Sequence, residues 1–366
     1  MRLLYLTDRL SDRGGADHHL IQVMSDAVTV GHRVEVGFGR DEGGPQLPET
    51  VARRRFAGLA SRVASSAKLG DLDDVIADAE IVHLQNVMNP VVLEMAAAHP
   101  RAVVTVQDHR VFCPGPGKTL PDGRPCAEVM GDRVCRGCLP DRGYRRATLE
   151  LTTRRLEALR AMTVVVLSRY MAGELAAVGV EGATIIPPWV KPGGSGSASG
   201  SRILIAGRLV AHKGITDAWR AWNRAGRPLP LEVAGAGPVE SELRGAALLG
   251  WLPPDELRAA IRRARMLLFP ARWQEPFGIL GVEALAEGTP VVVAACGGTN
   301  DWSDAGCVRV APGDVDAMAD AVARLSADGD AASAMGRRGR AAVAERFSEE
   351  RIPPLLEELY RKIFEA

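Results

Sequence analysis

Two glutamates, Glu275 and Glu283, stand eight residues apart on either side of Gly278, which precedes an apolar segment. That segment is expected to be a helix, and a helix aims its first free N–H groups and its positive dipole end at whatever lies before it. Such an end binds phosphate, and glycine lets the backbone come close. Glu275 could then accept hydrogen bonds from hydroxyls beside the phosphate, and Glu283, more than a turn deeper, lies where a ribose would hang. The arrangement suits a sugar nucleotide; the structural alternative is a helix with an acidic start.

A second candidate group follows an expected strand, 202–206. Arg208 and Lys213 stand five residues apart in the loop after that strand. Ligands of open parallel sheets bind beyond the carboxyl ends of the strands, so two cations here could neutralise a diphosphate leaving group. The alternative is a pair of solvated surface cations.

Both groups need parallel sheets to position them, and the chain shows the corresponding pattern twice. Apolar runs typical of buried strands alternate with helical patterns in 1–190 and again in 202–346. This alternation predicts an α/β fold with two doubly wound parallel-sheet domains. Residues 191–201 between them are rich in Gly and Ser, the composition of a flexible linker or of designed spacer sequence.

Composition excludes several classes of protein. The chain has 366 residues, 46% of them apolar and 25% charged, which is typical of a soluble protein of two or three domains. Its 45 basic and 45 acidic residues cancel, so there is no overall charge for binding nucleic acid. The N-terminus turns polar too early for a secretory signal, and no apolar run reaches the roughly 18 residues of a membrane span. We therefore expect a cytoplasmic protein with reduced thiols.

The stretch 272–290 resembles the Glu-x7-Glu signature of retaining glycosyltransferases of family 4, the glycosyl transferases group 1. The stretch 206–214 resembles the Gly-Arg-x-x-x-x-Lys-Gly motif of that family, whose two cations hold the pyrophosphate. The resemblance implies a GT-B fold: an acceptor-binding domain (1–190) and a nucleotide-sugar domain (202–346) facing across a cleft, and a C-terminal helix (347–366) that returns to the first domain. The implied contacts with the sugar nucleotide are Gly14, Gly15, Gly207, Arg208, Lys213, Gly235, Gly237, Glu275, Pro276, Phe277, Gly278, Ile279, Leu280 and Glu283.

The implied reaction moves a hexose-type sugar from a UDP- or GDP-sugar to an acceptor hydroxyl with retention of configuration. In this family the leaving diphosphate is thought to act as the base, and no catalytic divalent metal is needed. Stabilising that diphosphate is then the main task of the enzyme. Arg208, Lys213 and Glu275 are the corresponding catalytic candidates.

Three further catalytic candidates, Gln107, Asp108 and His109, end the expected strand 102–106. Family members commonly carry His-Asp at the first two of these positions, with the histidine near the transferred sugar, whereas here the first place holds Gln107. Because strand side chains alternate between faces, His109 would point the same way as Gln107 if the chain stayed extended. A structural histidine is the alternative.

Four of the six cysteines fall within 26 residues, in the spacing C-x12-C-x8-C-x2-C. Their segment, 110–142, is rich in Pro, Gly and Asp and has little capacity for a core of its own. A tetrathiolate zinc site is the first interpretation, followed by an iron–sulfur cluster and by four unpaired thiols. The segment resembles an insertion in a subset of family 4 enzymes and is expected to wall the acceptor pocket. The metal candidates are Cys113, Cys126, Cys135 and Cys138.

Two basic stretches bear on the acceptor. The segment 53–68 has apolar residues at helical spacing beside several cations, so it predicts either a membrane-surface helix or, because the apolar stripe is thin, a core-packed helix with a solvated cationic face. A second, strongly cationic helix is expected over 142–160. It would either attract an anionic or lipid-phosphate acceptor or simply be solvated. Its arginines are Arg142, Arg145, Arg146, Arg154, Arg155 and Arg160.

Together these observations predict a retaining, metal-independent glycosyltransferase. Its partners would be a nucleotide sugar and an acceptor glycan, lipid or small molecule, in the cytoplasm or at the inner face of the membrane. One alternative is a GT-B sugar-nucleotide epimerase or hydrolase, which would use the same pocket without a second sugar acceptor. The other is a non-catalytic binding protein organised by the metal module.

Overall fold

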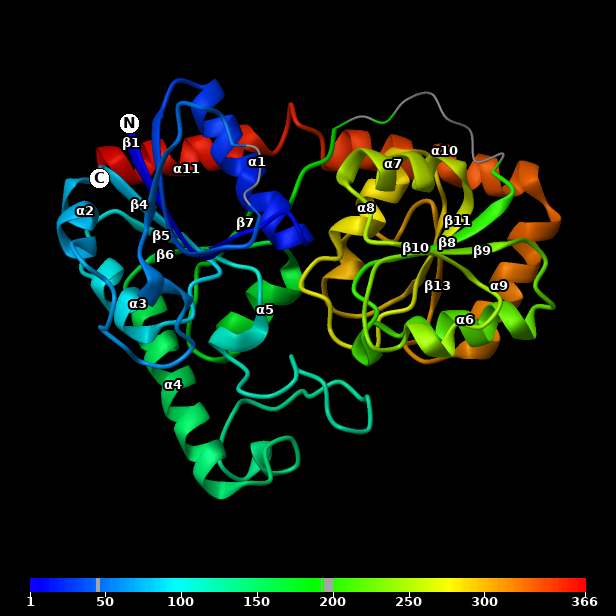
Figure 1. Ribbon diagram of the computed structural model, residues 1–366, viewed down its shortest axis with the longest axis horizontal. Helices are drawn as coiled ribbons and strands as arrows, with labels where there is room; N and C mark the ends of the chain where they lie inside the picture. The colour runs from blue at the N-terminus through cyan, green and yellow to red at the C-terminus, as the bar shows by residue number, and fades with distance from the viewer. Residues whose placement is uncertain (44–46, 192, 194–199) are drawn as a thin grey trace. The chain divides into compact units, whose positions relative to one another are not determined.

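The computed structural model describes residues 1–43, 47–191, 193 and 200–366. The chain forms two compact units: unit 1 is Met1–Pro188 together with Ile352–Ala366, and unit 2 is Trp189–Arg351. Each unit is a parallel sheet with helices on both faces (Figure 1). Most of the expected linker, 191–201, lies outside the described residues.

In the described part of unit 1, seven parallel strands are ordered β3-β2-β1-β4-β5-β6-β7. The strands are β1 (Arg2–Leu10), β2 (Arg33–Asp41), β3 (Ala52–Arg55), β4 (Ile81–Gln85), β5 (Ala102–Val106), β6 (Thr163–Val166) and β7 (Thr184–Ile185). The helices are α1 (Gly15–Thr29), α2 (Leu72–Asp78), α3 (Pro90–Ala97), α4 (Arg142–Arg160), α5 (Arg169–Ala177) and α11 (Pro353–Glu365).

Unit 2 has six parallel strands among its described residues, in the order β10-β9-β8-β11-β12-β13. They are β8 (Arg202–Ala206), β9 (Leu231–Ala234), β10 (Ala247–Gly250), β11 (Ala264–Phe269), β12 (Val291–Ala294) and β13 (Cys307–Val310). The helices are α6 (Ile215–Arg224), α7 (Pro254–Arg263), α8 (Ile279–Ala286), α9 (Val315–Ala327) and α10 (Gly329–Arg346). Two such sheets confirm the predicted α/β class.

The central strands are buried because helices cover both faces of each sheet. In unit 2, α6 and α9 pack together on one face, and α7, α8 and α10 pack together on the other (Figure 1). In unit 1, α3 packs on α4, and α1 contacts α11. Strands such as β5 and β12 are buried along their whole length, so their sequences read as nearly continuous apolar runs rather than as alternation.

In each sheet the strand order reverses beside the first strand of the unit, between β1 and β4 and between β8 and β11. Loops that leave neighbouring strands there turn to opposite faces and leave a crevice at the carboxyl ends, where open α/β sheets bind their ligands. In unit 2 the loop 207–214 leaves β8, and the loop 270–278 leaves β11. The two best-supported sequence motifs therefore meet at the reversal point of unit 2.

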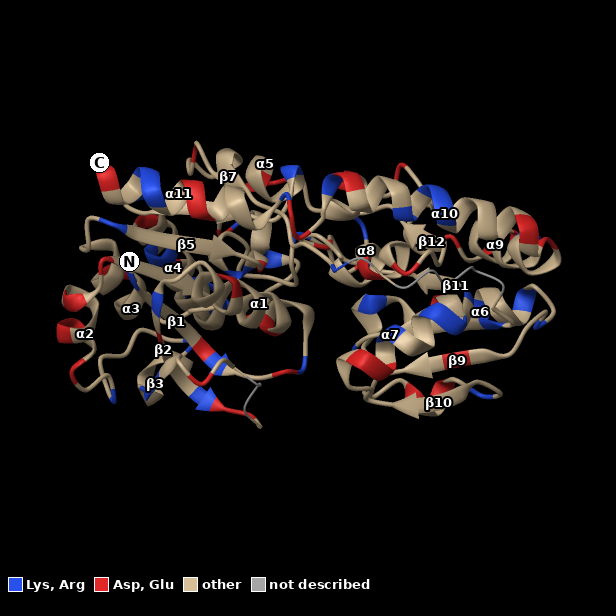
Figure 2. Cartoon of the chain, turned by 90° about the horizontal axis from the view of Figure 1, so that it is seen from above, with Lys and Arg blue, Asp and Glu red and all other residues tan. Residues whose placement is uncertain are grey.

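The C-terminal helix α11 is part of unit 1, although all of unit 2 precedes it in sequence. It carries charged residues of both signs (Figure 2), while Leu356 and Tyr360 are buried. The Tyr360 hydroxyl shares hydrogen bonds with the Tyr5 hydroxyl, at 3.0 Å, and with Nδ1 of His83 on β4. Nε2 of His83 lies 2.7 Å from the Thr105 hydroxyl on β5. A buried polar network thus joins the helix to three neighbouring strands.

We expect the stability of unit 1 to fall as the pH drops from 6.5 towards 4. Burial lowers the pKa of His83 to about 3, with a further contribution from His19, and burial lowers that of His19 to about 4. The unfolded chain binds these protons near pH 6.5, so it holds more protons than the folded state in this window. Each histidine then contributes a slope of up to about 1.4 kcal/mol per pH unit to the free energy of unfolding.

The unfolding of unit 1 can be followed separately because the two units contain different aromatic residues. All four tyrosines belong to unit 1 and all six tryptophans to unit 2, so tyrosine absorbance in a urea titration follows unit 1. His83→Gln should reduce the slope of unfolding free energy against pH, and the control His99→Gln should retain it. A slope of zero between pH 6.5 and 5 in the unsubstituted protein would contradict the prediction.

The prediction of a helix over 53–68 is wrong. Residues 52–55 form the edge strand β3, which pairs in parallel with β2, and a 3-10 turn (Ala57–Ala60) follows. Phe56 and Leu59 are buried in the core, but Val63 is 58% exposed, so no continuous apolar stripe exists. Strand pairing along β2 takes precedence over the local helical spacing. No described helix of the chain is both long enough and apolar enough to cross a membrane.

The expected cationic helix exists as α4, but most of its arginines are committed to structural contacts. Arg154 pairs with Glu94 at 2.7 Å, and Arg160 donates to the carbonyls of Val178 and Gly179 that end α5. Arg155 is buried, and its guanidinium donates to the carbonyls of Met88, Arg110 and Arg62. These contacts favour a structural role for the helix over attraction of an anionic acceptor.

Candidate functional site

The loop 207–214 is held against the loop 270–278 by a glycine that no other residue could replace without displacing the backbone. Gly214 has φ +68° and starts α6, and a Cβ there would stand 1.9 Å from the Pro270 carbonyl oxygen. The backbone N–H groups of Arg272 and Trp273 donate to the His212 carbonyl at 3.0 and 3.3 Å. Lys213, at the end of the 3-10 turn Ala211–Lys213, is thereby brought beside Glu275.

Glu275 is the centre of the site. It is buried, and its Oε1 accepts from Nζ of Lys213 at 2.6 Å and from the indole N–H of Trp273 at 2.7 Å. The ammonium group of Lys213 also lies 4.9 Å from the centre of the Trp273 ring. Carboxylate, indole and ring face hold the cation in one position at the carboxyl ends of β8 and β11. A lysine held in this way can neutralise an anion without reorganising.

The expected helix after Gly278 is present as α8. Gly278 is its N-cap, with φ +88°, and no described side chain caps the first turn. The orphan N–H groups and the dipole of α8 therefore remain available to an anion. Gly281 lies so close to Trp302 that a Cβ would approach its ring to 2.1 Å, which locks α8 onto the turn 297–301. Glu283, one turn further, is half-buried.

The other predicted glycines of unit 2 have a packing role. A Cβ at Gly235 would stand 1.9 Å from the Gly207 carbonyl oxygen, and one at Gly237 would stand 2.4 Å from that of Leu209. Both glycines have positive φ, and their backbone packs directly against the backbone of the loop that carries Arg208. Phe277 is buried with its ring against Phe347, and its carbonyl accepts from the Trp302 indole at 2.7 Å. Pro276 is buried beside it, and Ile279 and Leu280 open α8.

Three residues of this site were not singled out from the sequence. Asp217, buried in the first turn of α6, accepts two hydrogen bonds from Arg272 and so ties the loop after β11 to α6. The ring of His212 packs on Trp273, with centroids 5.1 Å apart, and burial together with Lys213 and Arg208 lowers its pKa. Trp273 stands two residues before Glu275, and this nearness to the Glu-x7-Glu pattern is the one local signal that could have drawn attention to it.

In unit 1, Gly14 and Gly15 begin α1 just beyond β1, at the reversal point of that sheet. Gln107 is buried, and its amide donates to Nδ1 of His19 at 2.6 Å, as does Gln85 at 3.2 Å. Burial keeps His19 neutral, so it can accept. Gln107 is therefore part of a buried cluster next to α1.

Asp108 and His109 lie differently from their expected arrangement. Burial alone would raise the pKa of Asp108, but the Arg110 guanidinium 2.9 Å away and the Arg110 N–H hold it below its usual range. The chain does not stay extended, because a 3-10 turn begins at His109. His109 is 1% exposed, with Nε2 3.1 Å from the Tyr170 hydroxyl and its ring against Phe112. The expected alignment of His109 with Gln107 is therefore lost, and a catalytic role for either stays a prediction.

The four clustered cysteines line one small cavity of about 20 Å³ in unit 1. All are free thiols. In the part of the chain that the structure describes, no three His, Cys, Asp or Glu residues stand in a preformed metal-binding arrangement. The sequence pattern thus brings the cysteines together, and the zinc assignment stays a prediction.

Comparison with known proteins finds sequence relatives for the second half of the chain. The family described as "Glycosyl transferases group 1" matches residues 200–328. Glycogen synthase of Mycobacterium tuberculosis is 31% identical over 175 residues, covering 44% of this chain and 42% of that protein. 2-Deoxystreptamine glucosyltransferase of Streptomyces kanamyceticus is 31% identical over 163 residues, covering 40% of this chain and 42% of that protein. The chain thus spans about two fifths of the length of these relatives.

Solved structures match over the full length. Sucrose-phosphate synthase from Thermosynechococcus elongatus has a TM-score of 0.77 at 19% identity and covers all of both chains. Anabaena Alr3699/HepE, in complex with UDP and glucose, has a TM-score of 0.72 at 16% identity, covering 98% of this chain and 99% of that one. The chain therefore has a GT-B fold, and its residues 200–328 match the family described as "Glycosyl transferases group 1".

Proposed function

We propose that the protein is a retaining glycosyltransferase of family 4 that moves a hexose-type sugar from a nucleoside-diphosphate sugar to an acceptor hydroxyl. The observation that carries the proposal is the fixed Lys213–Glu275 pair, 2.6 Å apart, beside the uncapped start of α8. It lies within the matched residues 200–328 and at the reversal point of the sheet. A cation and a helix terminus at this point are suited to a diphosphate.

In the proposed reaction the bond between the anomeric carbon and the diphosphate oxygen breaks, and the acceptor oxygen bonds to the same face of the sugar. The leaving diphosphate takes the proton of the acceptor hydroxyl. Arg208, Lys213 and the N–H groups of α8 stabilise the charge that develops on it, so side-chain cations do the work that a divalent metal does elsewhere. Glu275 orients Lys213 and accepts hydrogen bonds from hydroxyls near the phosphate, and Glu283 accepts hydrogen bonds from the ribose.

The names of the relatives support a sugar donor but leave its identity open. One Mycobacterium tuberculosis relative, 33% identical over 160 residues, is named a GDP-mannose-dependent mannosyltransferase, whereas Alr3699/HepE was solved with UDP and glucose. We propose a UDP- or GDP-hexose as donor and a glycan, lipid or small molecule as acceptor. A cytoplasmic location, with peripheral contact at the inner membrane face for a lipid acceptor, belongs to the same proposal.

The test is an assay of the full chain with UDP-glucose, UDP-N-acetylglucosamine and GDP-mannose, with and without cell-extract acceptors. Release of nucleoside diphosphate that depends on the acceptor, with an α-linked product by NMR, is the expected result. Release without acceptor would instead favour a hydrolase, and an altered sugar nucleotide would favour an epimerase. No turnover together with no nucleotide binding would favour a non-catalytic binding protein.

A further inference from the structure

The four clustered cysteines come from separate parts of one loop-rich segment, the cysteine module, residues 113–141. Cys113 follows the turn that carries His109, Cys126 lies in the middle, and Cys135 and Cys138 flank the end of the 3-10 turn Val134–Arg136. All four line the same cavity. Gly115 lies between two of them: a Cβ built there would stand 3.7 Å from Sγ of Cys138 and 3.9 Å from Sγ of Cys113.

The backbone between Gly115 and Lys118 turns its N–H groups towards Sγ of Cys113, although burial of this thiol raises its pKa above the ordinary value. The Lys118 N–H lies 3.3 Å from Sγ of Cys113, and the N–H groups of Gly115 and Gly117 also donate to it. Gly117 and Lys118 have φ +72° and +53°, so consecutive left-handed residues curl the backbone around the sulfur. Concave groups of N–H donors of this kind are found around anions and metal-bound sulfur. The left-handed conformation is unfavourable for a non-glycine residue such as Lys118, and the contact of its N–H with Sγ of Cys113 accounts for it.

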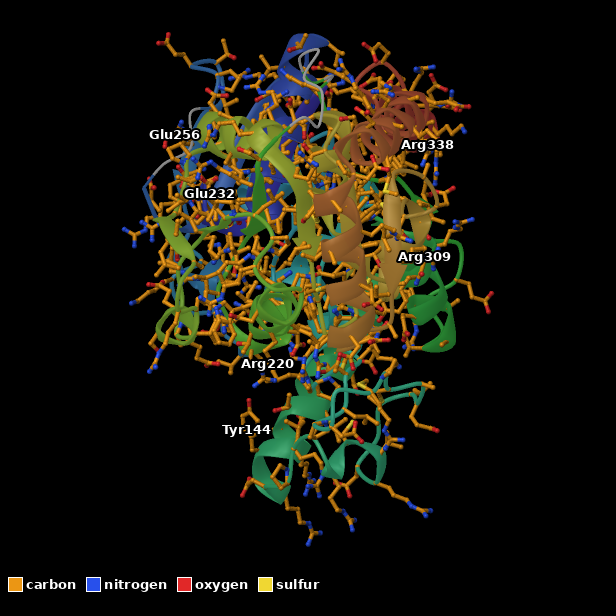
Figure 3. The ribbon with its side chains drawn as sticks, turned by 90° about the vertical axis from the view of Figure 1, so that its right-hand side faces the viewer. Tyr144, Arg220, Glu232, Glu256, Arg309 and Arg338 are labelled. Atoms are coloured by element: carbon orange, nitrogen blue, oxygen red, sulfur yellow. The ribbon has the colours of Figure 1, made fainter. Side chains whose placement is uncertain are left out.

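The cysteine module lacks the means to hold its own shape. All of its residues are described, and its regular structure is limited to the turn Val134–Arg136 and an isolated pair, Thr119 with Pro125. Val129 and Val134, which a core would cover, are 48% and 37% exposed, and Tyr144, in the first turn of α4, points into solvent (Figure 3). Segments shorter than about 40 residues usually need disulfides, a metal or a partner to fold.

Two buried cations attach the module to the rest of unit 1. Arg145 on α4 donates to Asp132 at 2.8 Å and to the carbonyls of Leu139 and Pro140. Lys118 pairs with Glu174 on α5 at 3.0 Å and donates to the Glu128 carbonyl at 2.8 Å. Arg145 thus holds the C-terminal end of the module against α4, and Lys118 holds its N-terminal part against α5.

We propose that Cys113, Cys126, Cys135 and Cys138 bind one zinc ion as a tetrathiolate. Four soft ligands around one centre suit zinc, whose structural sites are closed and four-coordinate. The cavity, about 20 Å³, is close to the space of a single water molecule, which favours one ion over an iron–sulfur cluster. Binding draws the thiolates together, and the ordering of the module is coupled to it.

The site also bears on the acceptor side of unit 1. The backbone N–H of Cys113 donates to the His109 carbonyl at 2.7 Å, and Phe112 lies between them against the His109 ring. Lys118 reaches Glu174 on α5, the helix that also provides Tyr170, the partner of His109. The metal therefore fixes the turn that contains His109 from both of its sides. In the enzyme proposed above, metal loss would impair acceptor transfer and spare nucleotide binding by unit 2.

The first test measures metal in the full chain purified without chelator. About one zinc per chain is expected, and after removal of the metal under reducing conditions Zn²⁺ alone should rebind with a one-to-one end point. Four thiols should react with a thiol reagent in the metal-free protein and be protected in the zinc form. Iron with a brown colour would overturn the zinc assignment, and no zinc uptake with four freely reacting thiols would overturn the site.

Variants separate the ligands from the other cysteines. Cys126→Ser and Cys138→Ser should each lower zinc affinity by at least about 100-fold, and Cys307→Ser, in unit 2, should leave it unchanged. Tryptophan fluorescence, which reports only on unit 2, checks that the variants remain folded there. If a ligand variant fails to fold, the zinc titration of the unsubstituted chain still decides the proposal. A Cys307→Ser variant that loses zinc while Cys138→Ser retains it would refute the assigned ligands.

Discussion

Replacing Lys213 with alanine is expected to lower kcat by about 100- to 1,000-fold, the range typical of removing a preorganised group that stabilises developing charge. Lys213 is held by Glu275 at 2.6 Å and by the face of Trp273, so it needs no reorganisation when the diphosphate leaves. Charge on the diphosphate increases as the sugar bond breaks. The loss should therefore be larger in kcat than in the affinity for nucleoside diphosphate, measured by steady-state kinetics and calorimetry.

The matched control is Arg338→Ala, which removes an exposed cation of the same unit that points outward from α10 (Figure 3). It should leave kcat within about twofold, the scale of a surface substitution. Because Lys213→Ala leaves the buried Glu275 carboxylate without its ammonium partner, a urea titration followed by tryptophan fluorescence checks that unit 2 of this variant stays folded. Equal losses of nucleotide affinity and of rate would show that Lys213 binds ground state and transition state alike.

Replacing Glu283 with alanine is expected to weaken nucleoside-diphosphate binding at least about tenfold. The proposed ribose contact consists of one or two charge-assisted hydrogen bonds, each contributing about 1.5–3 kcal/mol. Glu283 is half-buried in α8, one turn beyond the uncapped start of the helix, so the ribose of a diphosphate bound there would lie within its reach. Calorimetry with UDP and with GDP measures the change.

Glu256→Ala is the control for that substitution. Glu256 lies on α7 and points outward (Figure 3), so its removal should leave nucleotide affinity unchanged. An unaltered dissociation constant for Glu283→Ala with both nucleotides would remove the ribose assignment. The proposed phosphate contacts at Lys213 and α8 would be unaffected by that result.

The parallel sheets could be predicted because their strands are buried on both faces. Segments such as 102–106 and 202–206 read as apolar runs, and β5 and β8 begin and end at those residues. Gly278 could also be picked out, since it stands just before an expected helix, and its φ of +88° is a conformation that favours glycine. These signals are local, and each is visible within a few residues of the chain.

What could not be predicted depends on contacts between distant segments. The edge strand β3 exists because β2 lies beside it, which the spacing of Phe56 and Leu59 cannot show. Arg155 looks like one cation of a charged face, yet its contacts are three carbonyls from separate loops. The pairing of Arg272 with Asp217 joins residues 55 positions apart, so neither stands out in sequence.

The return of α11 to unit 1 makes unit 2 an insertion within the sequence of its neighbour. During synthesis on the ribosome, residues 1–188 emerge before unit 2, but Tyr5 and His83 gain the hydroxyl of Tyr360 only after that residue has left the exit tunnel. Unit 2 is contiguous in sequence and can be completed earlier. Unit 1 therefore begins to emerge before unit 2 and is finished after it. In a nascent chain that stops short of residue 352, His83 and Tyr5 lack the helix that covers them.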